Sequence, residues 1–425
     1  MLRRPFVANV GKVASGAAGA QLLTVAFMPV ITRLYGPDAF GLLGSFLALT
    51  AMVTPVAALG YPFAVVLPGR DDQARALVRL SCLIAFGSSA VFAVPFFLYR
   101  EELARVLQIQ GVESYLILIP FVMISAAILE AGEQWLIRFK KFGRTAKIAV
   151  AHSLIVNTAK TGVGLVSPTA AALIALSVLG NFLHAGMLFA GGGRLKRGID
   201  LPNQSMGAVS LRGVAFQYRH FPLYRAPQLL VNAASLALPV LFLASFFGPA
   251  AAGFYTVARR VLAMPSRLIG KAVGDVFYPR ISEAFHNRED LGALIFGATR
   301  GLLIVGVLPF ALVFAFGPWI FSVVFGSEWE LGGHYARWLA IWLLFGFACR
   351  PCVVAIPVLG IQRGFLVYEV LSTCFKLVAI LVGAMIFESA LASVALYSAI
   401  GAIAYLVLMG WVIFVAKGAN NSWHQ

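Results

Sequence analysis

The stretch LYGPDAFGLL, residues 34–43, lies between two long apolar runs, and FFGPAAAGFY, residues 246–255, repeats its Gly-Pro-x-x-x-Gly pattern between two more. A proline directly after a glycine ends a helix, and the second glycine lets the chain begin the next helix within about five residues. Gly248 follows Gly36 by 212 residues, which is half of the 425-residue chain. Each copy therefore predicts a tight hairpin, at the same place in the two halves of a duplicated fold.

The repeat extends beyond the two turns, because each hairpin is followed by a long apolar helix with a further proline. The matched hairpin and hinge residues are Gly36, Pro37, Gly41 and Pro55 in the first copy and Gly248, Pro249, Gly253 and Pro265 in the second. One copy alone would be a common turn. Two copies at half-length spacing favour an internal duplication, which is frequent in transporters.

The composition places the chain in a membrane. Sixty per cent of the residues are hydrophobic, 12% are charged and the mean hydropathy is +0.88, which is more apolar surface than one globular core can hide. Stretches of about 20 apolar residues, the length of helix that crosses a bilayer, recur along the chain, and no period-two alternation typical of barrel strands accompanies them. We predict twelve membrane helices, at 13–34, 41–67, 77–99, 114–135, 148–167, 171–191, 226–247, 254–278, 294–316, 336–357, 366–387 and 390–415.

The net charge of +16 is explained by membrane topology. If the N-terminus is cytoplasmic, about 21 of the 33 Lys and Arg residues fall on the cytoplasmic side and three on the other side. This asymmetry follows the positive-inside rule and predicts that both termini are cytoplasmic. It also makes nucleic acid an unexpected partner, and membrane lipids the expected surroundings of the basic segments.

The duplication predicts two lobes of six helices. Because six is even, both lobes have the same orientation, so the repeat is parallel and its axis lies along the membrane normal. We predict an N-lobe at residues 1–192, a basic cytoplasmic linker at 193–225 and a C-lobe at 226–425.

Several cations fall inside the predicted spans, where a charge costs about 2.5 to 3.5 kcal/mol at the helix centre. Arg260, Arg267 and Lys271 are separated by seven and four residues, so they lie within roughly 40° of one helix face. The matching positions of the first lobe hold no charge, which favours a functional role. The cations predicted to line a cavity and bind an anionic substrate are Arg260, Arg267, Lys271, Lys160, Arg350, Lys376 and Arg300. For Lys271 and Arg300, reaching the membrane edge is an equal alternative.

The acids inside the spans are candidates for coupling to a proton or sodium gradient, since membrane carboxylates are the usual relay groups. They are Asp275, Glu130, Glu133 and Glu369. For Glu130 and Glu133, pairing with the basic loop that follows them is an alternative. No metal site is predicted, because the Cys349–Cys352 pair has no second Cys or His pair beside it. No cofactor is predicted either.

The sequence offers little support for an enzyme. A nucleotide-binding Gly-rich loop ending in Lys-Ser or Lys-Thr does not occur in the chain. The longest outer loop, around 317–335, offers only Glu328, Glu330 and His334 for acid–base chemistry. Loss of activity on neutralising Glu328 or His334 would reveal such an enzyme.

Residues 218–285, with RLYGPDAFGLL and ALGYPFAVVLP near the start and FGSEWELGGHYARWLA at 325–340, resemble the polysaccharide transporter, or O-antigen flippase, family. This family belongs to the multidrug/oligosaccharidyl-lipid/polysaccharide exporter superfamily. The resemblance implies an all-α integral membrane fold, with twelve helices in two lobes around a central cavity. It also implies that Arg260, in VARRVLAMP, matches a family arginine.

The resemblance further implies a function and a place. A bacterial protein of this family would move an undecaprenyl-diphosphate-linked oligosaccharide across the inner membrane by alternating access, for O-antigen, capsule or exopolysaccharide synthesis. A polysaccharide polymerase and chain-length proteins would then be partners. Two alternatives stay open: a multidrug or small-molecule exporter of the same superfamily, and a non-transporting scaffold for polysaccharide assembly.

Overall fold

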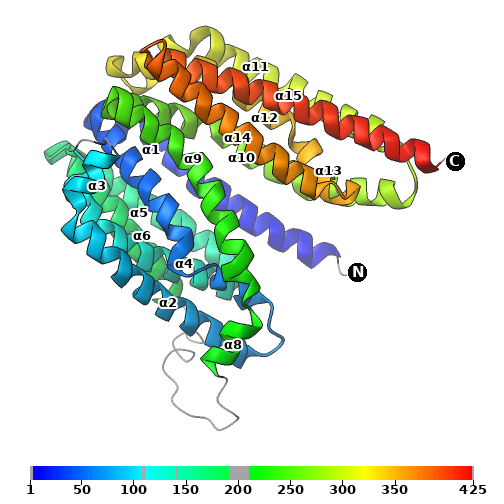
Figure 1. Ribbon diagram of the computed structural model, residues 1–425, viewed down its shortest axis with the longest axis horizontal. Helices are drawn as coiled ribbons and strands as arrows, with labels where there is room; N and C mark the ends of the chain where they lie inside the picture. The colour runs from blue at the N-terminus through cyan, green and yellow to red at the C-terminus, as the bar shows by residue number, and fades with distance from the viewer. Residues whose placement is uncertain (1–2, 108, 110, 140, 191–209, 424–425) are drawn as a thin grey trace. The chain divides into compact units, whose positions relative to one another are not determined.

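The part of the chain that the structure describes is helical and contains no strand (Figure 1). The structure is a computed structural model, and it describes residues 3–107, 109, 111–139, 141–190 and 210–423. The prediction of an all-α fold is confirmed. The elements are α1 (Arg3–Ala57), η1 (Tyr61–Val66), α2 (Asp71–Leu98), α3 (Arg100–Val106), η2 (Glu113–Leu118), α4 (Ile119–Arg138), α5 (Phe142–Val166), α6 (Ala170–Ala190), α8 (Leu211–Gln217), η3 (Phe221–Arg225), α9 (Ala226–Phe247), α10 (Pro249–His286), α11 (Leu291–Phe325), η4 (Ser327–Trp329), α12 (Glu330–Ala348), α13 (Arg350–Leu359), α14 (Gln362–Met385) and α15 (Ala390–Trp423).

The helices are of membrane-spanning length and composition. Within the described residues, 9 helical stretches are long and apolar enough to cross a bilayer. One of them, Ala18–Ala57, overlaps two of the predicted spans, 13–34 and 41–67. The predicted spans 148–167 and 254–278 fall on α5 and α10, which carry more polar and charged residues. The protein is therefore a multi-pass membrane protein, and the total of twelve crossings stays a prediction.

Both predicted hairpins are present, and their glycines share one unusual backbone conformation. Gly36 has φ 67° and ψ 172°, and Gly248 has φ 83° and ψ 175°. A positive φ combined with an extended ψ is open almost only to glycine. Pro37 and Pro249 follow directly, each in the first turn of the next helical segment, where a missing N–H costs nothing. Two glycines 212 residues apart thus have the same backbone conformation, and the duplication itself stays a prediction.

The remaining hairpin residues are helical. Gly41 and Gly253 are buried in the helical turns after the two prolines, and a side chain at Gly41 would collide with the backbone of Pro249. Pro55 lies inside α1. Pro265 is part of α10, and its side chain is outside the described part of the structure.

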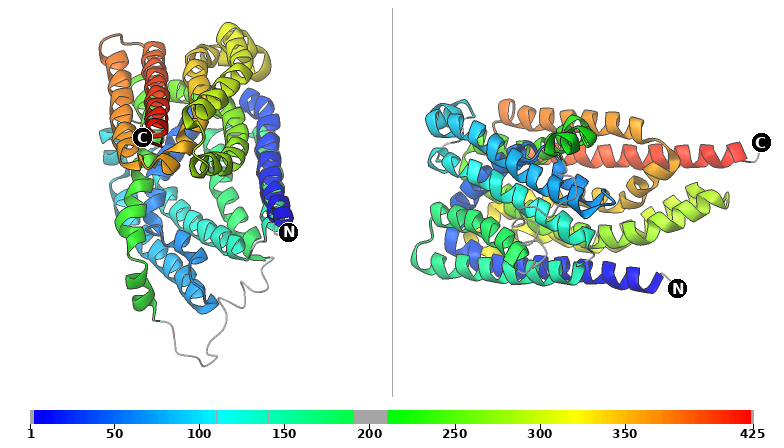
Figure 2. Two further views of the ribbon diagram at one scale, coloured as in Figure 1. Left: turned by 90° about the vertical axis from the view of Figure 1, so that its right-hand side faces the viewer. Right: turned by 90° about the horizontal axis from the view of Figure 1, so that it is seen from below.

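The chain forms two compact units, Met1–Pro249 and Ala250–Gln425. In the first unit α1 packs along α5 and α9, and α4 packs against α2 and α6. In the second unit α11 packs along α12, and α14 runs beside α15 (Figure 2). The contacts thus divide at the second hairpin, and α9 packs with the first unit. The predicted lobe limits at 192 and 226 remain a prediction, and most of the predicted linker, 193–209, lies outside the described residues.

Two predicted spans have different limits in the structure. The span predicted at 41–67 ends as an α-helix at Ala57, because Gly60 is left-handed with φ 74° and Pro62 follows it. The span predicted at 336–357 divides into α12 and α13 at Cys349. Pro351 explains this break, since it lacks the N–H that would continue the first helix.

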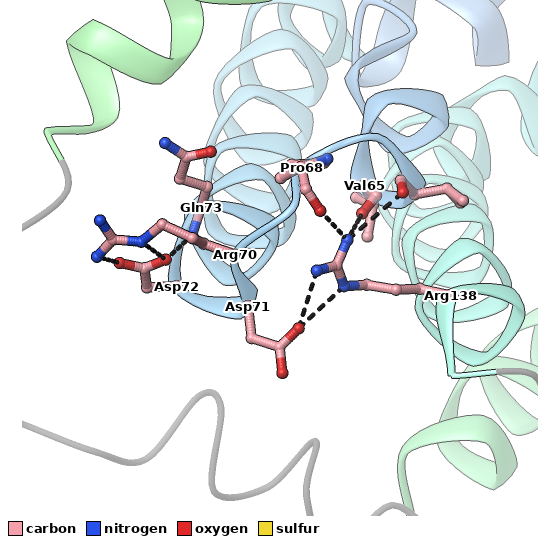
Figure 3. Close-up of polar contacts among 8 residues, drawn as sticks. Val65, Pro68, Arg70, Asp71, Asp72, Gln73 and Arg138 are labelled. Carbon is pink, nitrogen blue, oxygen red and sulfur yellow. Dashed lines mark hydrogen bonds and ion pairs between the residues drawn. The ribbon is translucent and has the colours of Figure 1, made fainter.

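Arg138, at the end of α4, ties that helix to the loop before α2 (Figure 3). Its Nε and Nη2 donate to Oδ1 of Asp71 at 3.1 and 2.9 Å, and its Nη1 donates to the carbonyl oxygen of Pro68 at 2.5 Å. Only 11% of the Arg138 side chain is exposed. This predicted cytoplasmic cation therefore has a structural role.

In the second unit, α11 and α12 approach closely at two facing glycines. A Cβ on Gly333 would overlap the backbone of Gly317, and a Cβ on Gly317 would lie 2.6 Å from the carbonyl oxygen of Gly333. Small residues at helix interfaces let backbones touch, which is how membrane helices gain packing without a hydrophobic driving force between them.

Candidate functional site

The predicted cationic face of α10 is described only in part. Arg260 lies on the helix and is exposed. Arg267 and Lys271 are placed on the helix backbone, but their side chains lie outside the described part of the structure. The helical spacing that puts the three residues on one side is confirmed, whereas the cavity that they were predicted to line stays a prediction.

Arg350 is the cation that packs against α10 within the second unit. It begins α13, and its side chain crosses α10 at Gly270, where an added Cβ would lie 3.1 Å from Nε. Gly270 directly precedes Lys271 and lies three residues after Arg267. The exposed Arg350 therefore adds a charge to the stretch of α10 that carries two of the predicted cations.

A group of cations and aromatic rings forms the core of the candidate site; we call it the aromatic–cation cluster. Its members, all in the second unit, are Tyr255, Arg259, Trp342, Lys376 and Tyr397. The Nζ of Lys376 is 5.8 Å from the centre of the Trp342 ring, and the guanidinium carbon of Arg259 is 5.9 Å from the Tyr255 ring. Tyr397 packs edge-on against both Trp342 and Tyr255, at 5.1 and 6.3 Å. Four helices, α10, α12, α14 and α15, thus meet around two positive charges.

Burial makes this cluster unusual. Tyr255, Trp342 and Tyr397 are buried, and Arg259 and Lys376 are half-buried. The two cations are close enough for their charges to repel, and the exposed Glu369, one of the predicted coupling acids, attracts Lys376. Aromatic faces stabilise a cation by roughly 0.5 to 2 kcal/mol. The rings lower the cost of holding both charges in an apolar fold, but they leave the net charge positive.

Polar hydrogens without a protein acceptor lie in and near the cluster. Among the described residues, the Nε1 of Trp342 is buried and has no hydrogen-bond partner, and the same holds for the hydroxyls of Thr256 and Ser398. Buried polar atoms are nearly always paired, so such atoms indicate a bound water or ligand. Together with the two cations, these donors suit an anion.

The other predicted site residues do not join the cluster. Arg300 is exposed on α11. Asp275 is placed on α10, but its side chain is outside the described part of the structure. Lys160 lies half-buried on α5 in the first unit, where its carbonyl oxygen accepts a hydrogen bond from the Tyr35 hydroxyl at 2.8 Å.

Glu130 and Glu133 are half-buried on α4 in the first unit. The Nε2 of Gln134 is 3.5 Å from Glu130, Arg225 on η3 attracts Glu130, and the two carboxylates repel each other. Arg225 itself stacks over the Phe63 ring at 5.1 Å and donates to Gln228 at 2.9 Å. Glu130 thus has a basic neighbour, as the alternative prediction expected, although that neighbour is Arg225 rather than the basic loop. The coupling role of both acids is untested.

Sequence reasoning missed the aromatic half of the cluster. Tyr255 and Arg259 are four residues apart on one helix, which is a signal that the sequence does carry. Trp342 and Tyr397 lie 34 and 21 residues from Lys376, and only the packing of α12, α14 and α15 brings them together.

A separate cavity of about 460 Å³ lies between α14 and α15. Its walls are almost entirely apolar and include Val367, Leu371, Phe375, Ile403 and Val407. Because it offers few polar atoms, it cannot hold a sugar or a phosphate.

Comparison with known proteins agrees with this fold. The family described as "Polysaccharide biosynthesis protein" matches residues 30–331, which is more than half of the chain. This chain belongs to that family. The matched region includes both hairpins and α10, and it ends before Arg350 and Lys376. The repeat and the cationic face of α10 stay predictions, and the aromatic–cation cluster rests on the structure alone.

Relatives and solved structures are more distant. The succinoglycan biosynthesis transport protein ExoT of Rhizobium meliloti (strain 1021) is 22% identical over 368 residues, covering 83% of this chain and 68% of the relative. An inward-facing multidrug resistance MATE family transporter of the MOP superfamily aligns with a TM-score of 0.73 at 14% identity, covering 94% of this chain and 96% of that one. The lipid II flippase MurJ aligns with a TM-score of 0.69 at 13% identity, covering 94% and 87%. The chain thus has the fold of MOP-superfamily transporters, as the sequence predicted.

Proposed function

We propose that this protein moves an undecaprenyl-diphosphate-linked oligosaccharide from the inner to the outer leaflet of a bacterial cytoplasmic membrane. Its family is one of polysaccharide biosynthesis proteins, one relative is named a transport protein of succinoglycan biosynthesis, and one protein of the same fold is named a lipid II flippase. By the charge asymmetry of its loops, both termini are cytoplasmic. The glycan would serve O-antigen, capsule or exopolysaccharide synthesis, with a polymerase and chain-length proteins as partners.

The observation that carries the proposal is the aromatic–cation cluster. A diphosphate is an anion that charge-assisted hydrogen bonds from Arg and Lys hold well. One unit charge about 4 Å from Lys376 would gain about 4 kcal/mol at an effective dielectric constant of 20. That gain is comparable to the cost of placing one cation in the membrane, about 2.5 to 3.5 kcal/mol. Binding of an anionic substrate would therefore offset the cost of these half-buried charges, which the packing of the fold alone does not explain.

The other predicted cations extend this site in the proposal. Arg260, Arg267, Lys271 and Arg350 belong to the same compact unit as the cluster, and Arg300 is its outlying member. Lys160 belongs to the first unit, and its contribution is a separate proposal. No covalent chemistry is needed, so the protein acts as a transporter and not as an enzyme.

Export of small molecules is the main alternative, because a MATE transporter shares the fold. Fold likeness at 14% identity does not choose between the two. The charge of the cluster favours an anionic substrate, since a cationic drug would be repelled by Arg259 and Lys376. A scaffold without transport would not need these buried cations at all.

The test is complementation of a strain that lacks the gene. Lys376→Gln removes the charge, Lys376→Arg keeps it, and Arg363→Gln removes an exposed charge from the same helix as a control. Membrane abundance of each variant is measured alongside surface glycan and inner-leaflet lipid-linked oligosaccharide. We expect Lys376→Gln alone to lose surface glycan and accumulate the intermediate. Normal glycan levels with Lys376→Gln would remove the cluster from the transport path and leave the scaffold as the better explanation.

The coupling of transport to a gradient is a further proposal. Glu130, Glu133 and Glu369 are described acids on membrane helices, and Asp275 lies on α10. Transport in vesicles that responds to neither a proton nor a sodium gradient would refute all four assignments.

A further inference from the structure

Two histidines face each other inside the first unit. His152 on α5 and His184 on α6 stack with ring centres 4.5 Å apart and planes inclined by only 13°. Both are half-buried, and His184 lies in Ala170–Leu188, one of the helices apolar enough to cross a membrane. Neither residue was singled out by the sequence, where they are 32 positions apart.

The hydrogen bond that His152 makes shows which of its ring nitrogens carries a hydrogen. One ring nitrogen of His152, Nε2, is 3.0 Å from the carbonyl oxygen of Gly180. A carbonyl oxygen only accepts, so Nε2 of His152 carries the hydrogen. The Nε2 of His184 is buried and has no hydrogen-bond partner among the described residues. The pair therefore has one paired donor, Nε2 of His152, and one buried nitrogen without a partner among the described residues, Nε2 of His184.

Glycine at position 180 makes this stack fit. A Cβ at Gly180 would lie 3.0 Å from Val156 and 3.5 Å from the Nε2 of His152. The imidazole of His152 thus lies against the backbone of α6, one helical turn before His184. The arrangement is a close-packed site at a helix interface, which responds to a change in either ring.

Charged residues of both signs lie on the elements that pack against α5 and α6. α5 packs against α1, α4 and α6, and α6 packs also against η2. Lys160 is the charged neighbour that acts on His152, and it is itself a cation. On α4, Glu130 and Glu133 interact with Arg225 and with each other. The other charged residues that the structure describes on these elements are Arg3, Arg4, Lys12, Arg33 and Asp38 of α1, Arg138 of α4, Arg144 and Lys147 of α5, and Glu113 of η2.

We infer that the His152–His184 pair is a proton-binding site whose occupation loosens the packing of α5 on α6. The described arrangement fits two neutral rings, because a proton on His184 would place a cation against its stacked neighbour with Lys160 nearby. In a conformation where His184 reaches water or a hydrogen-bond acceptor, its ring binds a proton more tightly. Protonation therefore shifts the population toward that conformation. This site differs from the acids proposed above, and its role in transport rests on the proposed function.

The first experiment measures the proton site without any substrate. The full chain in lipid nanodiscs is subjected to hydrogen–deuterium exchange at pH 5.5 and 7.5, with correction for the intrinsic rate. We expect faster exchange of residues 142–190 at the lower pH in the wild type. His184→Phe, which keeps a ring in the stack and cannot take a proton, should lose this pH response. His220→Gln, a change of an exposed histidine, should retain it.

The inference is overturned if the wild type exchanges equally at both pH values, or if the response persists in His184→Phe. A second variant, His152→Gln, covers the case in which His184→Phe does not fold. It removes the other ring of the stack, so it should also lose the pH dependence of exchange. Either variant that unfolds would show fast exchange at both pH values, and the other variant then decides.

A second experiment tests the link to transport. In vesicles that contain the protein and a lipid-linked oligosaccharide, an imposed pH gradient should change the translocation rate of the wild type, and His184→Phe should abolish that change. Translocation that ignores the gradient overturns the coupling. If the wild type moves no lipid-linked oligosaccharide at all, the proposed function has failed, and the exchange experiment still decides whether the proton site exists.

Discussion

Replacing either hairpin glycine by alanine should destabilise the protein by a matched amount. Gly36 has φ 67° with ψ 172°, and Gly248 has φ 83° with ψ 175°. A side chain in such a region costs on the order of 1 to 3 kcal/mol. For a unit of some 250 residues, each kcal/mol of lost stability lowers the melting temperature by about 2 °C. Gly36→Ala and Gly248→Ala should therefore each lower the melting temperature by about 2 to 6 °C.

The assay is thermal unfolding of purified protein in detergent, followed by a thiol-reactive dye that reports the buried cysteines Cys349 and Cys352. Gly87→Ala is the control, because Gly87 is on α2 with open space around it. Gly36→Asn should rescue nothing, because asparagine tolerates the left-handed helical region but not a positive φ with an extended ψ. Equal melting temperatures for Gly36→Ala and Gly87→Ala would refute the reasoning.

Three further changes test the packing. Arg138→Ala should cost about 1.5 to 3 kcal/mol of unfolding free energy, because it removes charge-assisted hydrogen bonds to Asp71 and Pro68. Gly333→Ala should destabilise the second unit by roughly 1 to 3 kcal/mol, since its Cβ meets the backbone of Gly317. His184→Phe should leave stability unchanged or raise it, because the buried Nε2 that it removes has no partner among the described residues. Melting temperature and membrane abundance measure all three.

Two of these changes, Arg138→Ala and Gly333→Ala, have matched controls. Arg75→Ala removes an exposed cation of α2, and Gly297→Ala adds a methyl group to α11 where nothing lies within 4 Å. Arg75→Ala should leave the melting temperature unchanged, and Gly297→Ala should leave it unchanged or raise it slightly, because alanine is favoured over glycine in a helix interior. An Arg138→Ala protein as stable as Arg75→Ala would show that the contacts of Figure 3 contribute nothing measurable.

Much of the fold could be predicted because its strongest signals are local. A Gly-Pro pair ends one helix and starts the next through backbone sterics alone, so the turns at Gly36 and Gly248 follow from the sequence. The residues at which helices end were less predictable, since hydropathy detects only the apolar part of each helix. α10 runs from Pro249 to His286, beyond the predicted 254–278, because the small residues 249–253 and the more polar segment 279–286 continue the helix at its two ends.

The candidate site was only partly predictable for a different reason. A cation inside an apolar span is visible in the sequence, and Lys376 was found in this way. The ring beneath it, Trp342, is an ordinary aromatic residue in an apolar helix until α12 and α14 are packed. The same is true of His152 and His184, whose stacking depends on the packing of α5 against α6.

The most direct test of the proposed function is a translocation assay with purified components. Vesicles containing wild type, Lys376→Gln or no protein are loaded with an undecaprenyl-diphosphate oligosaccharide, and a membrane-impermeant oxidant reports the sugar exposed outside. The loss of one charge-assisted contact, about 1.5 to 3 kcal/mol, should weaken diphosphate binding about 10- to 150-fold. We predict that the wild type exposes the inner-leaflet sugar and that Lys376→Gln is strongly slowed at limiting substrate. Wild-type vesicles that expose no more sugar than empty ones would contradict the account.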